Sequence, residues 1–189
     1  MIILAALSAV LLPIGVHIRN VPWEESRLVV NIFPIFGLLA FTLLWFHSIM
    51  GVFEEYFREM FDFDRFVDWT ATIILVSIIL HPLLILILVD FNFPLLLSGH
   101  KVAMWLGITG FLLLITYDIA KPWKFTYFSK YWNTILIVST IGFILTFFHS
   151  LLIGSDLQGG FMRVLWYFYG ITGILATIYT YGIKQYLNK

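Results

Sequence analysis

The stretch VSIILHPLLILILV, residues 76–89, decides the class of fold, because it places His81 inside an almost wholly apolar run. With the residues before it, the run covers about 69–89. A helix needs roughly 20 apolar residues to cross about 30 Å of hydrocarbon. The stretch therefore predicts a membrane helix. An imidazole at that depth needs a partner inside the protein, because there is no bulk water to solvate it.

The composition of the whole chain is that of an integral membrane protein. Of its 189 residues, 61% are hydrophobic, 19% aromatic and only 12% charged, and the mean hydropathy is +0.96. Such values lie far outside the range of soluble domains. The formal net charge is zero, which gives no indication of a nucleic-acid partner. Cysteine is absent, so disulfides, thiolate metal sites and iron–sulfur clusters are excluded.

The apolar segments predict an all-α integral membrane bundle of six helices in a single domain, residues 1–189. The first segment is barely long enough to span, and Pro13 interrupts it. It lacks a basic leader and a clear cleavage site, so we interpret it as a retained helix rather than a signal peptide. The expected spans are about 1–17, 28–52, 69–89, 102–119, 131–153 and 161–183.

The basic residues of the short loops predict the orientation of the bundle. Cytoplasmic loops carry an excess of Lys and Arg. The loops on the side of the N-terminus hold seven such residues and the opposite loops four, which places both termini in the cytoplasm of a multi-pass protein of the inner cell membrane. The seven are Arg58, Arg65, Lys121, Lys124, Lys130, Lys184 and Lys189, and the four are Arg19, Arg27, Lys101 and Arg163.

Two aromatic segments carry weaker expectations. Residues 53–69, FEEYFREMFDFDRFVDW, resemble an amphipathic helix that lies on the inner membrane surface with Phe57, Phe61 and Phe66 toward lipid. The aromatic run at 166–169 suits either ordinary packing or a slot for a quinone.

The five histidines divide by position. His17 and His100 fall in outer loops, where a solvated side chain is expected, and His47 lies among interfacial aromatics near the inner end of its span. His81 and His149 lie deep in two different spans, and both fall in the outer half of the bilayer. Two neutral imidazoles at similar depth on two helices of one bundle can hold a ligand between them.

A haem suits such a pair of histidines, because its iron takes two axial imidazoles and its flat macrocycle fills an apolar slot. Each Nε2 would bind the metal and each Nδ1–H would donate to a backbone carbonyl. For His81 we expect the carbonyl of Ser77, close to a bend at Pro82, and Gly142 would leave room beside His149. The residues alone leave open a second interpretation, in which both histidines are merely hydrogen-bonded to helix neighbours.

Four stretches of the sequence resemble the ferric reductase-like transmembrane domain family. That family includes ferric reductases, NADPH oxidases and the haem membrane subunit of the methionine sulfoxide reductase system. The resemblance covers about residues 28–183 and implies a haem-binding electron-transfer bundle. It rests on DFDRFVDW (62–69), LHPLL (80–84), SGHKVAMWLGITGFLLL (98–114) and KYWNTILIVSTIGFILTFFHSLLIGSD (130–156).

The sequence departs from that family at one of its two haems. Members pair an inner and an outer bis-histidine haem, with two histidines 13 or 14 residues apart on each ligand helix. At that interval the chain has Val67 or Asp68 before His81, and Ile135 or Leu136 before His149. The resemblance thus implies one b-type haem with His81 and His149 as axial iron ligands.

A one-haem chain needs a different electron route from that of its two-haem relatives. A stack of haems 14 residues apart spans roughly 21 Å, so the loss of the inner one leaves a wide gap. We expect a membrane quinol as donor and, as acceptor, ferric iron, oxygen or a soluble or periplasmic redox partner on the outer side. No residue is predicted to be catalytic, and whether the chain is itself an enzyme or the membrane subunit of an oxidoreductase stays open.

Three alternatives remain. The first is a haem-free structural or partner-binding bundle of the same family. The second is a small transporter, although Asp90, Asp118 and Asp156 all lie near span ends and matched broken helices are absent from the sequence pattern. The third gives His47 a noncanonical inner cofactor.

Overall fold

The computed structural model of the protein describes residues 2–23 and 27–184, with backbone alone for residues 2–6. Within these residues the chain is helical and has no strand, which confirms the expected all-α class. The eight α-helices are α1 (Ile2–Asn20), α2 (Leu28–Val52), α3 (Glu54–Met60), α4 (Phe63–Leu88), α5 (Phe93–Ser98), α6 (Lys101–Ala120), α7 (Trp132–Ile153) and α8 (Gly160–Ile178). Single turns join them at η2 (Lys121–Trp123), η3 (Ser129–Tyr131) and η4 (Ser155–Leu157), and the π-helical turn η5 (Tyr179–Ile183) prolongs α8.

Five helical segments are long and apolar enough to cross a membrane. They correspond to five of the expected spans, although Phe63–Leu88 begins earlier than expected, and they support a multi-pass membrane protein. Helix α1 forms as expected but is not among these five. The five segments are Leu28–Val52, Phe63–Leu88, Lys101–Trp123, Ser129–Ile153 and Gly160–Ile183.

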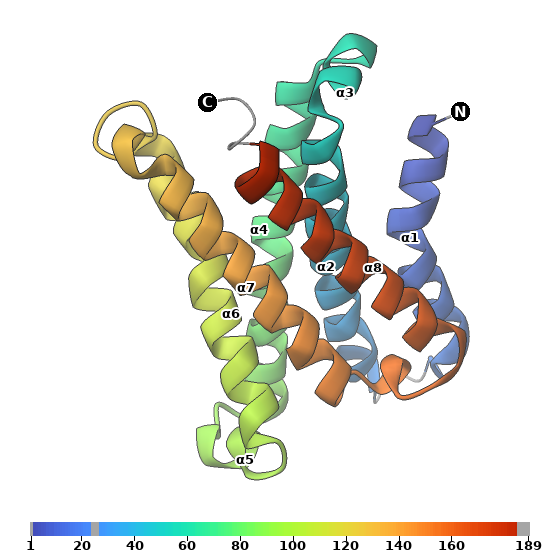
Figure 1. Ribbon diagram of the computed structural model, residues 1–189. Coiled ribbons are helices and arrows are strands. Elements are labelled where there is room, and N and C mark those ends of the chain that lie inside the picture. Colours follow the sequence, from blue (N-terminus) through green and yellow to red (C-terminus); the bar gives the residue numbers. More distant parts are fainter. Residues whose placement is uncertain (1, 24–26, 185–189) are drawn as a thin grey trace.

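Helix α2 is the centre of the bundle (Figure 1). It packs against α1, α4 and α8, while α6 and α7 form a closely packed hairpin of their own. The first turns of α1, the helix α3, the α6–α7 connection and η5 lie at one end of the bundle, which we name the α3 end. Helix α5 and η4 lie at the other, which we name the α5 end. Helices α4 and α7 therefore run in the same direction, from the α3 end to the α5 end.

Stacked aromatic rings join α2, α7 and α8. The ring of Phe41 lies 4.4 Å from Trp166 and 5.0 Å from Phe143, and Trp45 lies 4.3 Å from Tyr169, all between ring centroids. All five side chains are buried. Because lipid is as apolar as these rings, close packing rather than the hydrophobic effect holds such helices together. Trp166 and Tyr169 thus serve packing, the first of the two uses that the aromatic run allowed.

The predicted surface helix at 53–69 is wrong in its extent and in the direction of its phenylalanines. The chain breaks after α3, and Asp62 caps a new helix by accepting a hydrogen bond from the backbone N–H of Arg65. Helix α4 consequently begins six residues before the expected span. Phe57 is buried, and its ring and that of Phe66 lie 6.4 and 6.0 Å from the ring of Phe46. These side chains face the core of the bundle, because the short α3 folds back over the end of α2.

Candidate functional site

His81 lies in α4, and its imidazole reaches across to α2. The Nδ1 atom is 2.9 Å from the carbonyl oxygen of Phe33. The expected acceptor, the Ser77 carbonyl one turn back on the same helix, is therefore wrong. A carbonyl oxygen only accepts, so Nδ1 carries the hydrogen. The neutral ring then leaves the lone pair of Nε2 free, and this atom has no hydrogen-bond partner among the described residues.

His149 lies in α7 and repeats this arrangement with α6. Its Nδ1 atom is 2.7 Å from the carbonyl oxygen of Ala103, a buried residue. The Nε2 atom of this ring also lacks a hydrogen-bond partner in the described part of the chain. A hydrogen bond from Nδ1–H to a carbonyl is the arrangement that fixes the tautomer and direction of a metal-binding histidine.

Two glycines allow the rings to reach those carbonyls. A Cβ built on Gly37 of α2 would lie 3.0 Å from both Nδ1 and Cε1 of His81. A Cβ on Gly107 of α6 would lie 2.5 Å from Nδ1 and 2.6 Å from Cε1 of His149. The expected role of Gly142 is wrong, because α6 occupies the space beside it: its Cβ would meet the backbone of Gly110 and Leu114 at 2.8 Å. No pattern in the sequence indicates Gly37 as a neighbour of His81, since 44 positions separate them.

The two histidines lie in the same half of the bundle. His81 precedes the end of α4 by about 10 Å and His149 the end of α7 by about 6 Å, at 1.5 Å per residue. Both side chains are partly exposed. Helices α4 and α7 are not among the closely packed pairs of helices in the described chain.

This donor set suits a group that brings ligands of its own. Among the described residues, no cluster of three or more His, Asp or Glu side chains could hold a metal ion. A bare ion bound by protein usually takes three or four protein ligands. Two imidazoles with free Nε2 atoms could instead hold a group such as a haem, whose macrocycle would supply the remaining nitrogens to the iron.

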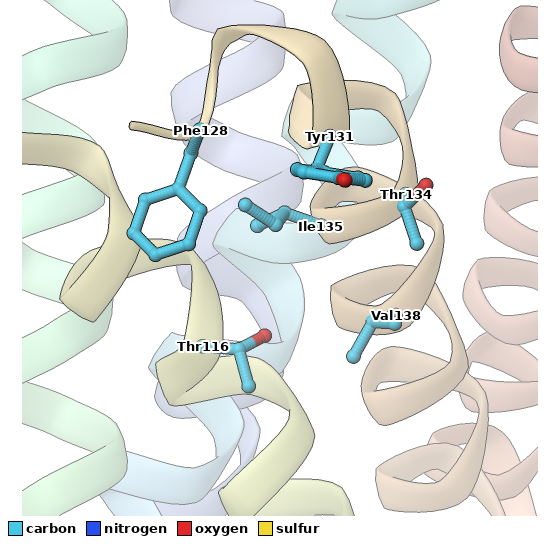
Figure 2. Close-up of a pocket in the computed structure, with 6 residues that line it drawn as sticks. All are labelled: Thr116, Phe128, Tyr131, Thr134, Ile135 and Val138. Atoms are coloured by element: carbon cyan, nitrogen blue, oxygen red, sulfur yellow. The ribbon is translucent and has the colours of Figure 1, made fainter. Parts of the chain in front are cut away.

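The positions at which the resemblance would place the ligands of an inner haem make other contacts. Asp68 is 2.8 Å from the ammonium of Lys121 in an exposed ion pair, and Val67 packs against the core. Ile135 lines an open apolar cavity of about 340 Å³ at the α3 end of the α6–α7 hairpin (Figure 2). The cavity residues are Thr116, Phe128, Tyr131, Thr134, Ile135 and Val138. This cavity contains no histidine and lies away from His149.

The prediction of a solvated His17 is wrong. The residue belongs to α1 and is only 1% exposed. Its Nδ1 atom is 2.6 Å from Oδ2 of Asp156, and its Nε2 atom is 2.8 Å from the carbonyl oxygen of Asn31. Asp156, which the sequence places near the end of a span, thus links η4 to α1. The sequence concealed this pair, because 139 positions separate its members.

The partners of His17 indicate an imidazolium. Both ring nitrogens face acceptors, so both must carry hydrogen. The hydrogen bond to Asp156 raises the pKa of His17, which lies outside the five candidate spans, and this effect exceeds the opposing effect of burial. Because neither ring nitrogen is free, His17 links α1 to its neighbours and does not serve as a metal ligand.

His47 and His100 are the remaining two histidines, and neither is part of the candidate site. His47 Nε2 is 2.6 Å from Oγ1 of Thr70, and the Thr70 hydroxyl donates in turn to the carbonyl of Phe66. Because that hydroxyl hydrogen is used, Nε2 of His47 must be the donor, and it is not free for a metal. His100 is exposed just before α6, as expected of a loop residue.

Comparison of the chain with models of protein families, with curated proteins and with solved structures finds no match. The function is therefore inferred from the two histidines and their surroundings.

Proposed function

We propose that the protein is a membrane b-type cytochrome that holds one haem between His81 and His149 and relays electrons across the outer half of the bilayer. The observation that supports this proposal best is the matched pair of hydrogen bonds from Nδ1 to the carbonyls of Phe33 and Ala103. Both bonds leave Nε2 free, on two parallel helices, at similar depth. The haem, when bound, supplies reversible one-electron chemistry.

The residues of the chain hold and orient that group. Each carbonyl fixes the tautomer of its histidine and raises the electron density on Nε2. Both histidines are partly exposed, which would allow a planar group to reach them from the side of the bundle. Such a group would lie against an apolar surface, as a macrocycle requires.

The proposed membrane topology adds α1 as a sixth span and places both termini in the cytoplasm of an inner cell membrane. The distribution of basic residues, seven at one side and four at the other, supports this orientation. The α5 end then faces outward and the histidines lie in the outer half. A quinol that diffuses within the bilayer is the proposed donor, and the acceptor is an outer one.

We also propose that the chain is a one-haem form of the ferric reductase-like transmembrane family. The positions that would supply an inner haem hold residues already engaged elsewhere, with Asp68 ion-paired to Lys121 and Ile135 in the apolar cavity. His47, whose Nε2 atom donates to Thr70, does not replace them.

The test is the haem content of the purified protein. We expect about one low-spin b haem per chain in a pyridine haemochrome assay and in a reduced-minus-oxidised spectrum. The His81→Leu and His149→Leu variants should each lose it. His100→Leu and His47→Leu are the exposed and the partly buried controls, and both should keep it.

Other outcomes of this test decide against the proposal. A carefully purified, haem-supplemented wild type without haem would favour a structural bundle. The same hydrogen bonds to carbonyls would then do no more than satisfy two histidines inside the bilayer. Two haems per chain would show that an inner site exists after all.

A further inference from the structure

The two imidazoles contact the same arrangement of a backbone carbonyl and a glycine, which occurs on two helices. On α2 the carbonyl of Phe33 accepts from His81, and the glycine four residues later, Gly37, touches the ring. On α6 the carbonyl of Ala103 accepts from His149, and Gly107, again four residues later, touches that ring. The spacing of carbonyl and glycine is the same in both.

Helix geometry explains why the glycine must stand at this spacing. Residues i and i+4 lie one above the other on the same face of a helix, and each Cα–Cβ bond tilts toward the N-terminus. A side chain at i+4 therefore projects over the carbonyl of residue i. Glycine leaves that carbonyl uncovered, so a ring from a neighbouring helix can lie against the backbone and donate to it.

We propose that Gly37 and Gly107 are positioning residues that set the direction and basicity of the two axial histidines and, through them, the redox potential of the bound haem. This inference rests on the proposed function. An Nδ1–H bond to a carbonyl makes an imidazole a stronger donor, which stabilises the oxidised form of the metal and lowers its potential. A methyl group at either glycine weakens that bond and raises the potential.

The two Gly→Ala substitutions should change the redox potential by different amounts. The added Cβ would lie 2.5 Å from the His149 ring at Gly107 but 3.0 Å from the His81 ring at Gly37. The first distance requires the ring to shift, whereas the second requires it to give by only a few tenths of an ångström. Gly107→Ala should therefore have the larger effect, and Gly37→Ala an effect of the same sign.

Two other glycines supply matched controls. Gly51 lies on α2 like Gly37, but its Cβ would meet only Thr180, at an ordinary 3.6 Å. Gly110 lies on α6 one turn after Gly107, and its Cβ would press on Thr146 at 2.8 Å without touching a histidine. Gly110→Ala thus disturbs the packing of α6 on α7 without a direct contact to the His149 ring.

The experiment is a redox titration of each purified variant, with low-temperature electron paramagnetic resonance of the oxidised protein. We expect Gly107→Ala to change the oxidation equilibrium at least tenfold, a rise of about 59 mV for a one-electron couple, and to alter the resonance of the low-spin haem. Gly37→Ala should shift both readouts less. Gly51→Ala should match wild type, and Gly110→Ala should lower the melting temperature at an unchanged potential.

The outcomes separate this inference from the proposed function. A wild-type protein that contains no haem would overturn both the inference and the proposed function. A haem-containing wild type whose potential is unaffected by Gly37→Ala and Gly107→Ala overturns the inference alone, as does a Gly110→Ala shift equal to that of Gly107→Ala. If Gly107→Ala does not fold, Gly37→Ala, where the contact is milder, decides the matter.

Discussion

His81, His149 and His17 share a residue type but differ in the number of acceptors around each ring. His81 and His149 each face one carbonyl, so each is neutral and keeps a free nitrogen. His17 faces a carboxylate and a carbonyl, so it holds two hydrogens and a positive charge. The same side chain thus keeps a free nitrogen in two places and forms a buried ion pair in the third.

The charge of His17 should make the stability of the protein depend on pH. Because its pKa is raised in the folded state, its contribution is fully present below the unfolded value of about 6.5. That contribution is lost as the pH rises through the folded pKa. Across this window the free energy of unfolding should fall by about 1.4 kcal/mol per pH unit. Thermal unfolding in detergent from pH 5 to 9 measures it.

Substitutions in the His17–Asp156 ion pair supply the control for this pH dependence. His17→Gln should lower stability at pH 6 by about 3 kcal/mol, because it leaves Asp156 without its cation, and should flatten the profile. Asp156→Asn should flatten it too, since the largest cause of the raised pKa is gone. A wild-type profile parallel to that of His17→Gln would contradict the assignment of an imidazolium.

At the scale of helices, α7 and α8 meet where aromatic rings lie on glycines. A Cβ on Gly170 of α8 would collide with the ring of Phe147, and that ring is held by Phe41 at 6.0 Å and Tyr167 at 6.3 Å between centroids. Gly170→Ala should therefore push α8 away from α7. Overpacking of this kind costs about 1–3 kcal/mol, which a lower melting temperature would show.

A second substitution tests whether the ring is the cause. Phe147→Leu removes the ring edge that the new methyl meets, so Gly170→Ala combined with Phe147→Leu should lose less stability than the sum of the two single changes. Gly182→Ala is the neutral control, because nothing lies within 4 Å of its Cβ position. If the losses of stability were strictly additive, the contact between the new methyl group and the Phe147 ring would not be the cause of the destabilisation.

Hydropathy predicts these helices well but not how they meet. The bounds of α2, α6 and α7 lie within one residue of the expected spans, since apolar length alone determines them. Helix α4 begins early at Phe63, in a charged segment where hydropathy is uninformative and the Asp62 cap decides. The carbonyl partners of His81 and His149 lie 48 and 46 positions away. Such contacts depend on helix packing, which the periodicity of an apolar chain does not reveal.

At the scale of the whole molecule, the two ends of the bundle differ in the number of their basic residues, although not in net charge. The α3 end carries ion pairs between Arg58 and Asp64 and between Lys121 and Asp68. The basic residues Lys124 and Lys130 lie there as well, in the α6–α7 connection. The larger number of Lys and Arg residues supports the proposed cytoplasmic side of the α3 end, because the rule counts basic residues rather than net charge.

The absence of cysteine allows a direct test of that orientation, because every added thiol is the sole target for a membrane-impermeant maleimide. Ser98 at the α5 end and Ser129 at the α3 end are both exposed and suit matched Ser→Cys changes. Ser98→Cys should react in intact cells, and Ser129→Cys only after the membrane is opened. The opposite pattern would invert the topology and place the two histidines near the cytoplasmic face.

The same reagent tests whether α1 is a sixth span. Asn20 ends α1 and is exposed, and Ser8 lies near the middle of the helix, also with an exposed side chain. If α1 crosses the bilayer, Asn20→Cys should react from the outside like Ser98→Cys. Ser8→Cys should then resist the reagent from both sides, because lipid covers it and an impermeant maleimide does not enter hydrocarbon. Labelling of Ser8→Cys in intact cells would mean that α1 lies on the outer surface, so that only the five longer helices span the membrane and the N-terminus is outside.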